Sequence, residues 1–71
     1  NLVVFPNPTT DFINIKTTKR DIENVYIHDL AGKLIYSGKS MKINVANFPS
    51  ATYIISIKTP EGLKSFKFIK I

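Results

Sequence analysis

The stretch Leu2-Val3-Val4-Phe5-Pro6-Asn7-Pro8 places an apolar run directly before an abrupt corner. Proline has no N–H to give to a sheet ladder and holds φ near about −65°, so neither Pro6 nor Pro8 fits inside a central strand. Pro8 also drives Asn7 toward an extended conformation. The stretch therefore predicts a short strand, Leu2–Phe5, that ends in a rigid corner.

Short apolar segments recur along the rest of the chain with turn residues between them. This regular spacing is typical of a β-sandwich or a small barrel. Aromatic and β-branched residues favour strand over helix, also in the lysine-rich C-terminal segment. We predict strands at Leu2–Phe5, Phe12–Lys16, Asn24–His28, Lys33–Ser37, Met41–Val45, Thr52–Lys58 and Lys64–Ile71. The predicted fold class is all-β, an Ig-like (immunoglobulin-like) antiparallel β-sandwich of about seven short strands.

Two connections share one turn chemistry, with a side-chain acceptor first and glycine fourth: Asp29-Leu30-Ala31-Gly32 and Thr59-Pro60-Glu61-Gly62. This pattern suits a type I turn followed by a left-handed residue. Asp29 can bond back to the turn's backbone, and each glycine supplies a positive φ without steric cost. Each connection therefore predicts a β-hairpin.

Alternation at period two assigns one face of each strand to the core. The predicted core residues are Leu2, Val4, Ile13, Ile15, Val25, Ile27, Ile43, Val45, Tyr53, Ile55, Ile57, Phe66 and Phe68. Tyr26, Tyr36 and Ile54 are expected to lie outward or at the sheet margins. In the C-terminal segment, the same alternation puts Lys64 and Lys70 on one face and Lys67 on the other.

The chain has 71 residues, of which 44% are hydrophobic and 21% charged, as expected for one small folded domain. It contains no cysteine, so disulfides cannot staple it. No apolar run approaches the ~20 residues of a membrane-spanning helix. The sequence begins at Asn1 without a methionine or a signal-like segment, which predicts one domain, residues 1–71, excised from a longer protein.

Ten Lys and Arg residues against five Asp and Glu residues give a net charge of +5, which raises the question of an acidic partner. The cations are scattered, and nine of the ten are lysine, which recognises phosphate less specifically than arginine does. A solvated surface therefore explains the charge better than a nucleic-acid interface. We expect no nucleic-acid partner, and a monomer.

The sequence contains few residues of the kinds that catalyse reactions or bind metal ions or phosphate. His28 is the single histidine and cysteine is absent, so the sequence offers neither a catalytic triad nor a zinc set. The carboxylates fall in or beside predicted loops, and the three glycines are too far apart for a phosphate-binding loop. We therefore predict no catalytic residue, no metal site and no cofactor.

The order of these segments resembles the type A C-terminal sorting domain of the bacterial type IX secretion system, also called the Por secretion system sorting domain. The resemblance spans almost all of the chain. The segments that carry the resemblance are Phe5-Pro6-Asn7-Pro8, Thr9-Thr10-Asp11, Phe12–Ile15, Val25–Asp29 with Gly32-Lys33, Ile43–Val45, Phe48–Tyr53 and the terminal Lys67-Phe68-Ile69-Lys70-Ile71. Within these segments, Phe5, Pro6, Asn7, Pro8, Asp29, Gly32, Lys33 and Tyr53 are the expected structural residues.

This resemblance implies a non-catalytic secretion signal that directs its parent protein across the outer membrane. The implied partners are the type IX translocon, an outer-membrane shuttle protein, a cell-surface sortase that removes the domain, and an N-terminal passenger domain in the parent chain. The implied location is the periplasm in transit, then the cell surface or the medium. Ile71 would be the C-terminus of the parent.

Within the domain, the terminal segment is the expected recognition element: Lys67, Phe68, Ile69, Lys70 and Ile71. We expect Phe66 and Phe68 to anchor this strand while Lys67 and Lys70 remain accessible to a receptor. Two other functions stay open at this point. One is a β-sandwich accessory module that binds carbohydrate or a neighbouring domain, and the other is a basic nucleic-acid-binding barrel.

Overall fold

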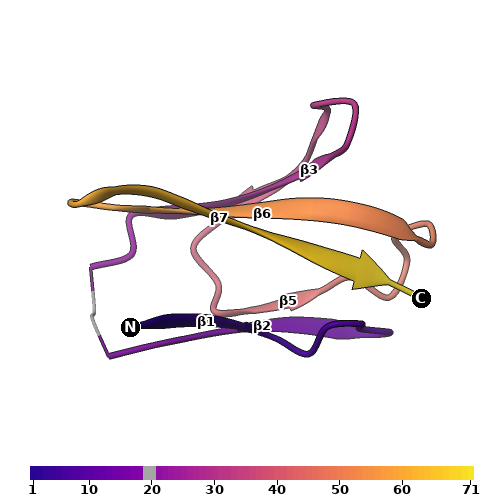
Figure 1. Ribbon diagram of the computed structural model, residues 1–71, viewed down its shortest axis with the longest axis horizontal. Helices are drawn as coiled ribbons and strands as arrows, with labels where there is room; N and C mark the ends of the chain where they lie inside the picture. Colours follow the sequence, from indigo (N-terminus) through magenta and orange to yellow (C-terminus); the bar gives the residue numbers. More distant parts are fainter. Residues whose placement is uncertain (19–20) are drawn as a thin grey trace.

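Two antiparallel β-sheets form the two layers of the computed structural model, which describes residues 1–18 and 21–71 (Figure 1). One sheet has the strand order β1-β2-β5 and the other the order β4-β3-β6-β7. The strands are β1 (Leu2–Phe5), β2 (Phe12–Thr17), β3 (Asn24–Asp29), β4 (Leu34–Gly38), β5 (Lys42–Asn44), β6 (Ala51–Thr59) and β7 (Gly62–Lys70). No helix occurs in the described ranges. The predicted all-β sandwich is confirmed.

The turn between β3 and β4 is held by the side chain of Asp29. Its Oδ1 accepts hydrogen bonds from the N–H groups of Ala31 and Lys33, both at 2.9 Å, and Gly32 has a φ of 88°. Lys33 therefore belongs to the turn, and β4 begins one residue later than the sequence suggested. The predicted hairpin and its left-handed glycine are both confirmed.

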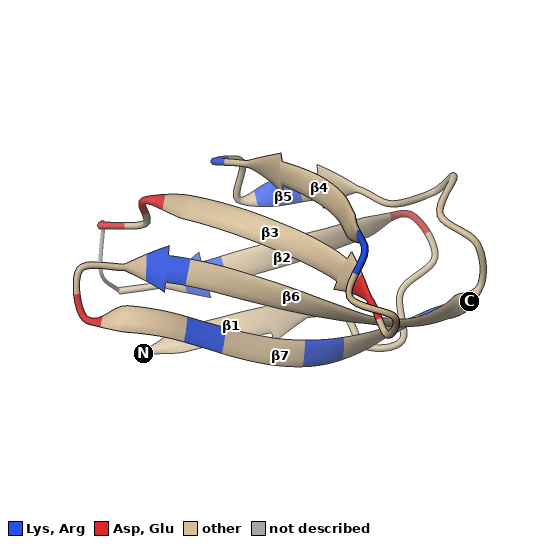
Figure 2. Cartoon of the chain, turned by 90° about the horizontal axis from the view of Figure 1, so that it is seen from above, with Lys and Arg blue, Asp and Glu red and all other residues tan. Residues whose placement is uncertain are grey.

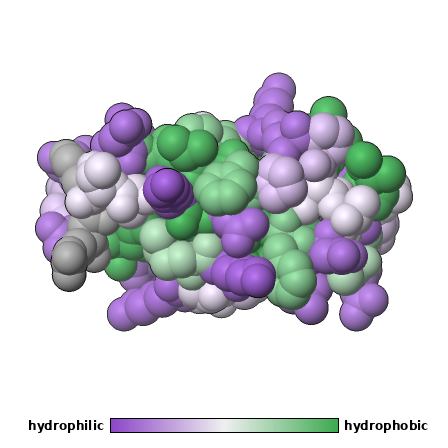
Figure 3. All heavy atoms as spheres, turned by 90° about the horizontal axis from the view of Figure 1, so that it is seen from below, coloured by the Kyte–Doolittle hydropathy of each residue, from purple (hydrophilic) through white to green (hydrophobic). Residues whose placement is uncertain are grey.

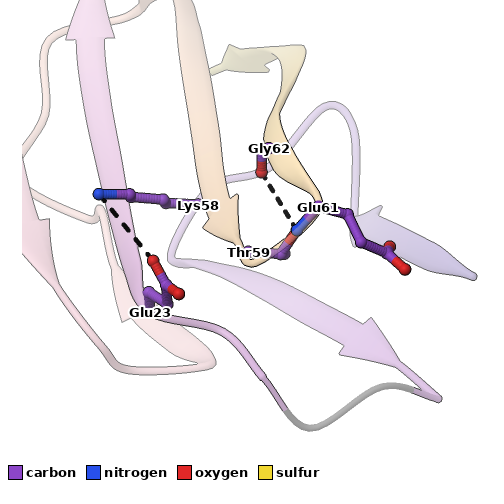
Figure 4. Close-up of polar contacts among 5 residues, drawn as sticks. All are labelled: Glu23, Lys58, Thr59, Glu61 and Gly62. Carbon is purple, nitrogen blue, oxygen red and sulfur yellow. Dashed lines mark hydrogen bonds and ion pairs between the residues drawn. The ribbon is translucent and has the colours of Figure 1, made fainter.

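The turn between β6 and β7 closes the longest hairpin of the fold, in which nine residues of each strand pair. Figure 4 shows Thr59 at this turn, where its hydroxyl donates to the carbonyl of Gly62 at 3.1 Å. The same hydroxyl oxygen accepts the N–H of Glu61 at 3.2 Å, and Gly62 has a φ of 122°. A tight turn thus fixes the register of β7 along its whole length.

The core lies between the sheets, where alternate residues of each strand meet. Its buried hydrophobic residues are Ile13, Ile15, Val25, Ile27, Ile43, Val45, Tyr53, Ile55, Ile57 and Phe68. Leu2, Val4 and Phe66, also predicted as core, lie on the edge strands β1 and β7 and are only partly buried. Tyr36 lies opposite Ile27 on the edge strand β4 and packs partly against the core.

One buried polar pair was not expected from the sequence. Ser56 is 6% exposed in the middle of β6, on the sheet face that points away from the core. Its hydroxyl lies 2.8 Å from the hydroxyl of Ser65, the residue opposite it on β7. This hydrogen bond satisfies a hydroxyl that neighbouring strands cover.

Candidate functional site

The expected recognition element is the second half of β7, an edge strand of the four-stranded sheet. Alternation divides its side chains between two faces. Phe68 points into the core and is fully buried, whereas Lys67 is exposed and Ile69 is 48% exposed on the outer face. Ile71, just past the strand, is 62% exposed. A receptor that approaches the folded domain therefore meets Lys67, Ile69 and Ile71.

Lys70 does not lie where we expected it. It is 7% exposed, and its Nζ donates a hydrogen bond to the backbone carbonyl of Ile71 at 2.9 Å. The expectation that both terminal lysines are accessible is therefore wrong for Lys70. Because Lys70 is two residues from Phe68, the period of a strand carries it to the same, inner side.

The proline corner after β1 contacts the end of the chain, 60 to 62 residues away in sequence. The side-chain oxygen of Asn7 accepts the N–H of Ile69 at 2.9 Å, and its amide nitrogen donates to the carbonyl of Lys67 at 3.3 Å. Thr9 forms an isolated parallel bridge, in which its N–H donates to the carbonyl of Ile69 and its carbonyl accepts the N–H of Ile71, both at 2.9 Å. The corner therefore takes the place of a neighbouring strand.

We call this part of the β7 edge the capped half: the carbonyl of Lys67, both backbone groups of Ile69 and the N–H of Ile71. Thr9, which supplies two of the four bonds, is 2% exposed, and its hydroxyl donates to the carbonyl of Phe12. The peptide bonds before Pro6 and Pro8 are both cis. The two most distinctive motifs of the sequence thus form one structural unit.

Tyr53 links the same unit to the core. Its hydroxyl donates to the carbonyl of Pro49 at 2.6 Å, a bond back to the preceding connection like the one that tyrosine makes in many immunoglobulin-like sandwiches. Its ring stacks on Phe68 at 5.6 Å between centroids and meets Phe48 edge-on at 5.3 Å. Phe68 is therefore held from β6 as well as by its own strand.

The charged side chains of β7 are all lysines. Figure 2 shows acidic residues at connections and strand ends, and basic residues both along strands and in connections. The ion pair between Lys58 and Glu23 spans 3.9 Å with both side chains about half exposed, so solvent weakens it (Figure 4). The outer face of the C-terminal half of β7 therefore carries positive charge only, from Lys67.

The described residues contain no group of three or more His, Cys, Asp and Glu side chains that could hold a metal ion. They also contain no helix with the length and apolar character needed to cross a membrane. The polar side chains of Asn7, Asp29 and Tyr53 bond to backbone groups. Their geometry positions strands and turns.

The family model described as "Secretion system C-terminal sorting domain" matches residues 3–71, almost the whole chain. The chain belongs to this family. The match includes both the proline corner and the terminal strand, the two segments that the structure brings together. The sorting domain of type IX secretion is a signal and not an enzyme, so the prediction of a non-catalytic domain is confirmed. The family also implies export to the cell surface or secretion.

A curated relative is the ulvan lyase NLR42 of Nonlabens ulvanivorans, which is 39% identical over 59 residues. The match covers 76% of this chain and 11% of the lyase, so the chain spans about a tenth of that protein's length. No solved structure matched the chain. The lyase name describes the far larger remainder of the relative, and the sorting domain is the shared part.

Proposed function

We propose that residues 1–71 are the single C-terminal sorting domain of a longer secreted protein and that the domain serves as its export address. The parent enters the periplasm by a separate signal, and the sorting domain then engages the outer-membrane translocon. A shuttle protein carries the cargo to a cell-surface sortase, which removes the domain. The sorting-domain family of the chain supports this sequence of events.

The observation that carries the proposal is that some side chains of the C-terminal strand are buried and others are exposed. Phe68 and Lys70 are buried and hold the strand, whereas Lys67, Ile69 and Ile71 are exposed. A lysine with two exposed isoleucines combines a charge with apolar area, which suits a receptor surface that is partly apolar and negatively charged. We assign recognition of the receptor to the three exposed residues. The two buried residues hold the strand in place.

A reporter protein fused to the domain tests this assignment in a host that has a type IX secretion system. The double variant Lys67→Ala/Ile69→Ala removes two accessible side chains, neither of which forms a hydrogen bond with residues 1–18 or 21–71. We expect its melting temperature to stay within about 4 °C of the unaltered domain. Export to the medium should fall about tenfold, as a loss of ~1.4 kcal/mol of binding would produce.

The matched control is Lys39→Ala/Met41→Ala, which removes a lysine and a similarly exposed apolar residue from the connection between β4 and β5. The control should be exported normally. Normal export of the folded Lys67→Ala/Ile69→Ala variant would reject the recognition assignment. Export of the reporter without any sorting domain would reject the address function itself.

A second candidate function is an accessory module that binds carbohydrate or a neighbouring domain, and one surface favours it. Hydrophobic patches lie on the outer face of the β1-β2-β5 sheet (Figure 3). Phe5 of β1 and Phe12 of β2 are 42% and 37% exposed. The Nζ of Lys42 lies 4.4 Å from the centroid of the Phe12 ring. Exposed rings of this kind can stack on sugars or pack against a protein surface. The double variant Phe5→Ser/Phe12→Ser should weaken adhesion or substrate binding but leave export intact if this function holds.

A further inference from the structure

The first half of β7 turns backbone groups toward solvent at the edge of the four-stranded sheet. In an antiparallel ladder, every second residue directs both its N–H and its C=O away from the neighbouring strand. Ile69 directs both groups to the corner, so Ser65 and Leu63 face the same way. Their backbone groups and the N–H of Lys67 have no hydrogen-bond partner among residues 1–18 and 21–71. We call this part of the edge the open half.

A groove of about 640 Å³ runs beside the open half, between β1 and β7. Its apolar lining includes Leu2 of β1, Ile22, and Leu63 and Phe66 of β7. Leu2, Ile22 and Phe66 are partly buried and pack against the core, so their remaining exposed surface faces a space that no described residue fills. A strand added beside β7 would direct every second side chain toward this groove.

We propose that the open half docks an extended segment of a partner protein, which joins the four-stranded sheet beyond β7. The segment spans about five residues, or ~17 Å, opposite Leu63 to Lys67. Its backbone pairs with the free N–H and C=O groups, and its alternate side chains are apolar and enter the groove. The proposal rests on the export function, because the partner is a component of the export machinery.

Charge indicates what else the segment carries. Lys64 and Lys67 are exposed beside the open half, whereas Asp21 and Glu61 line the groove at its turn end. Because Lys64 lies on the groove face of the strand and Lys67 on its outer face, an acidic residue of the partner is favoured near each of the two lysines. Lysines on an edge strand also discourage indiscriminate strand pairing. A second copy of the domain fits less well, because each copy carries a net charge of +5.

Ser65→Pro tests the backbone part of the proposal, with Ser65→Ala as its matched control. Both variants remove the hydroxyl contact with Ser56, but the proline variant alone removes the outward N–H. Proline is tolerated on an edge strand where the N–H faces solvent, so the Ser65→Pro domain should melt within about 4 °C of Ser65→Ala. Export of a reporter should be about tenfold lower for Ser65→Pro than for Ser65→Ala.

Lys64→Glu tests the charge part, and its control is Lys39→Glu, the same change in an exposed connection. Both substitutions are at exposed positions, so folding is unaffected. If Ser65→Pro fails to fold, this pair of variants decides whether a partner segment docks along the open half. Lys64→Glu should lower export severalfold relative to Lys39→Glu, because it places a carboxylate against the acidic residue of the segment.

Three results would overturn the proposal. Equal export within both variant pairs would show that nothing docks along the open half. A dimer in sedimentation velocity that Ser65→Pro dissociates would identify a second copy as the occupant. If the unaltered domain does not export the reporter at all, the address function is wrong and the docking proposal falls with it. Export by the unaltered domain and by Ser65→Ala, with retention of folded Ser65→Pro, supports it.

Discussion

The two halves of the β7 edge belong to one strand but meet different neighbours. The capped half is bonded by Asn7 and Thr9, and the open half has no backbone partner among the described residues. Both halves have the same β6 ladder behind them, so the difference comes from the corner alone. A short loop that imitates a strand can therefore protect and hold part of an edge and leave the rest free to pair.

The largest change to this arrangement is the loss of Phe68, which anchors the capped half from below. Phe68→Ala removes a fully buried ring that stacks on Tyr53, and it should lower the free energy of unfolding by about 3–5 kcal/mol. Urea titration monitored by circular dichroism measures this loss. Ile69→Ala, on the exposed side of the same strand, is the control and should cost much less. Equal midpoints for the two variants would contradict the anchoring role.

A smaller change breaks the cap and spares the core. Asn7→Ala removes two hydrogen bonds to β7 and should lower the free energy of unfolding by about 1–2 kcal/mol. Amide hydrogen exchange should then become faster at Ile69, and remain unchanged at Phe66, whose N–H faces β6. Asn47→Ala, in the exposed connection before β6, is the control. Unchanged exchange at Ile69 would mean that the tail does not depend on Asn7.

The smallest expected effect concerns the ion pair between Lys58 of β6 and Glu23, which directly precedes β3. Lys58→Ala separates Lys58 from Glu23, and because both side chains are about half exposed it should change the free energy of unfolding by less than about 1 kcal/mol. Thermal melts in low salt and in 1 M salt measure the pair, since screening at about 1 M removes most of a surface interaction. A larger loss than that of Asn7→Ala would mean that this exposed ion pair stabilises the domain more than the hydrogen bonds of the capped half do.

Much of this fold could be predicted from local sequence rules. The side-chain period of two assigned the core faces of the strands, and the ten buried hydrophobic residues were all among the predicted ones. The two hairpin turns followed from a polar acceptor and a glycine at fixed positions. Such rules work because they depend on neighbours within a few residues. The same period implied that Lys70 lies on the side of Phe68, although the expectation of an accessible Lys70 ignored it.

The contact between the corner and the tail could not be predicted in this way. Two prolines around an asparagine indicate that a strand stops, but they carry no information about which distant backbone groups the asparagine will meet. The buried pair of Ser56 and Ser65 is a similar case, because it depends on the register between two strands. Family resemblance named the two motifs without relating them to each other.

The sequence by itself determined which residues form strands, which turn, and which side of each strand is apolar, because alternation and turn chemistry are local properties. Only the tertiary structure decided that Asn7 and Thr9 bond to the edge at Lys67, Ile69 and Ile71, and that Lys70 is buried. These features arise when two sheets pack and bring edges that are far apart in sequence side by side. Which backbone groups remain free at an edge is therefore settled by packing.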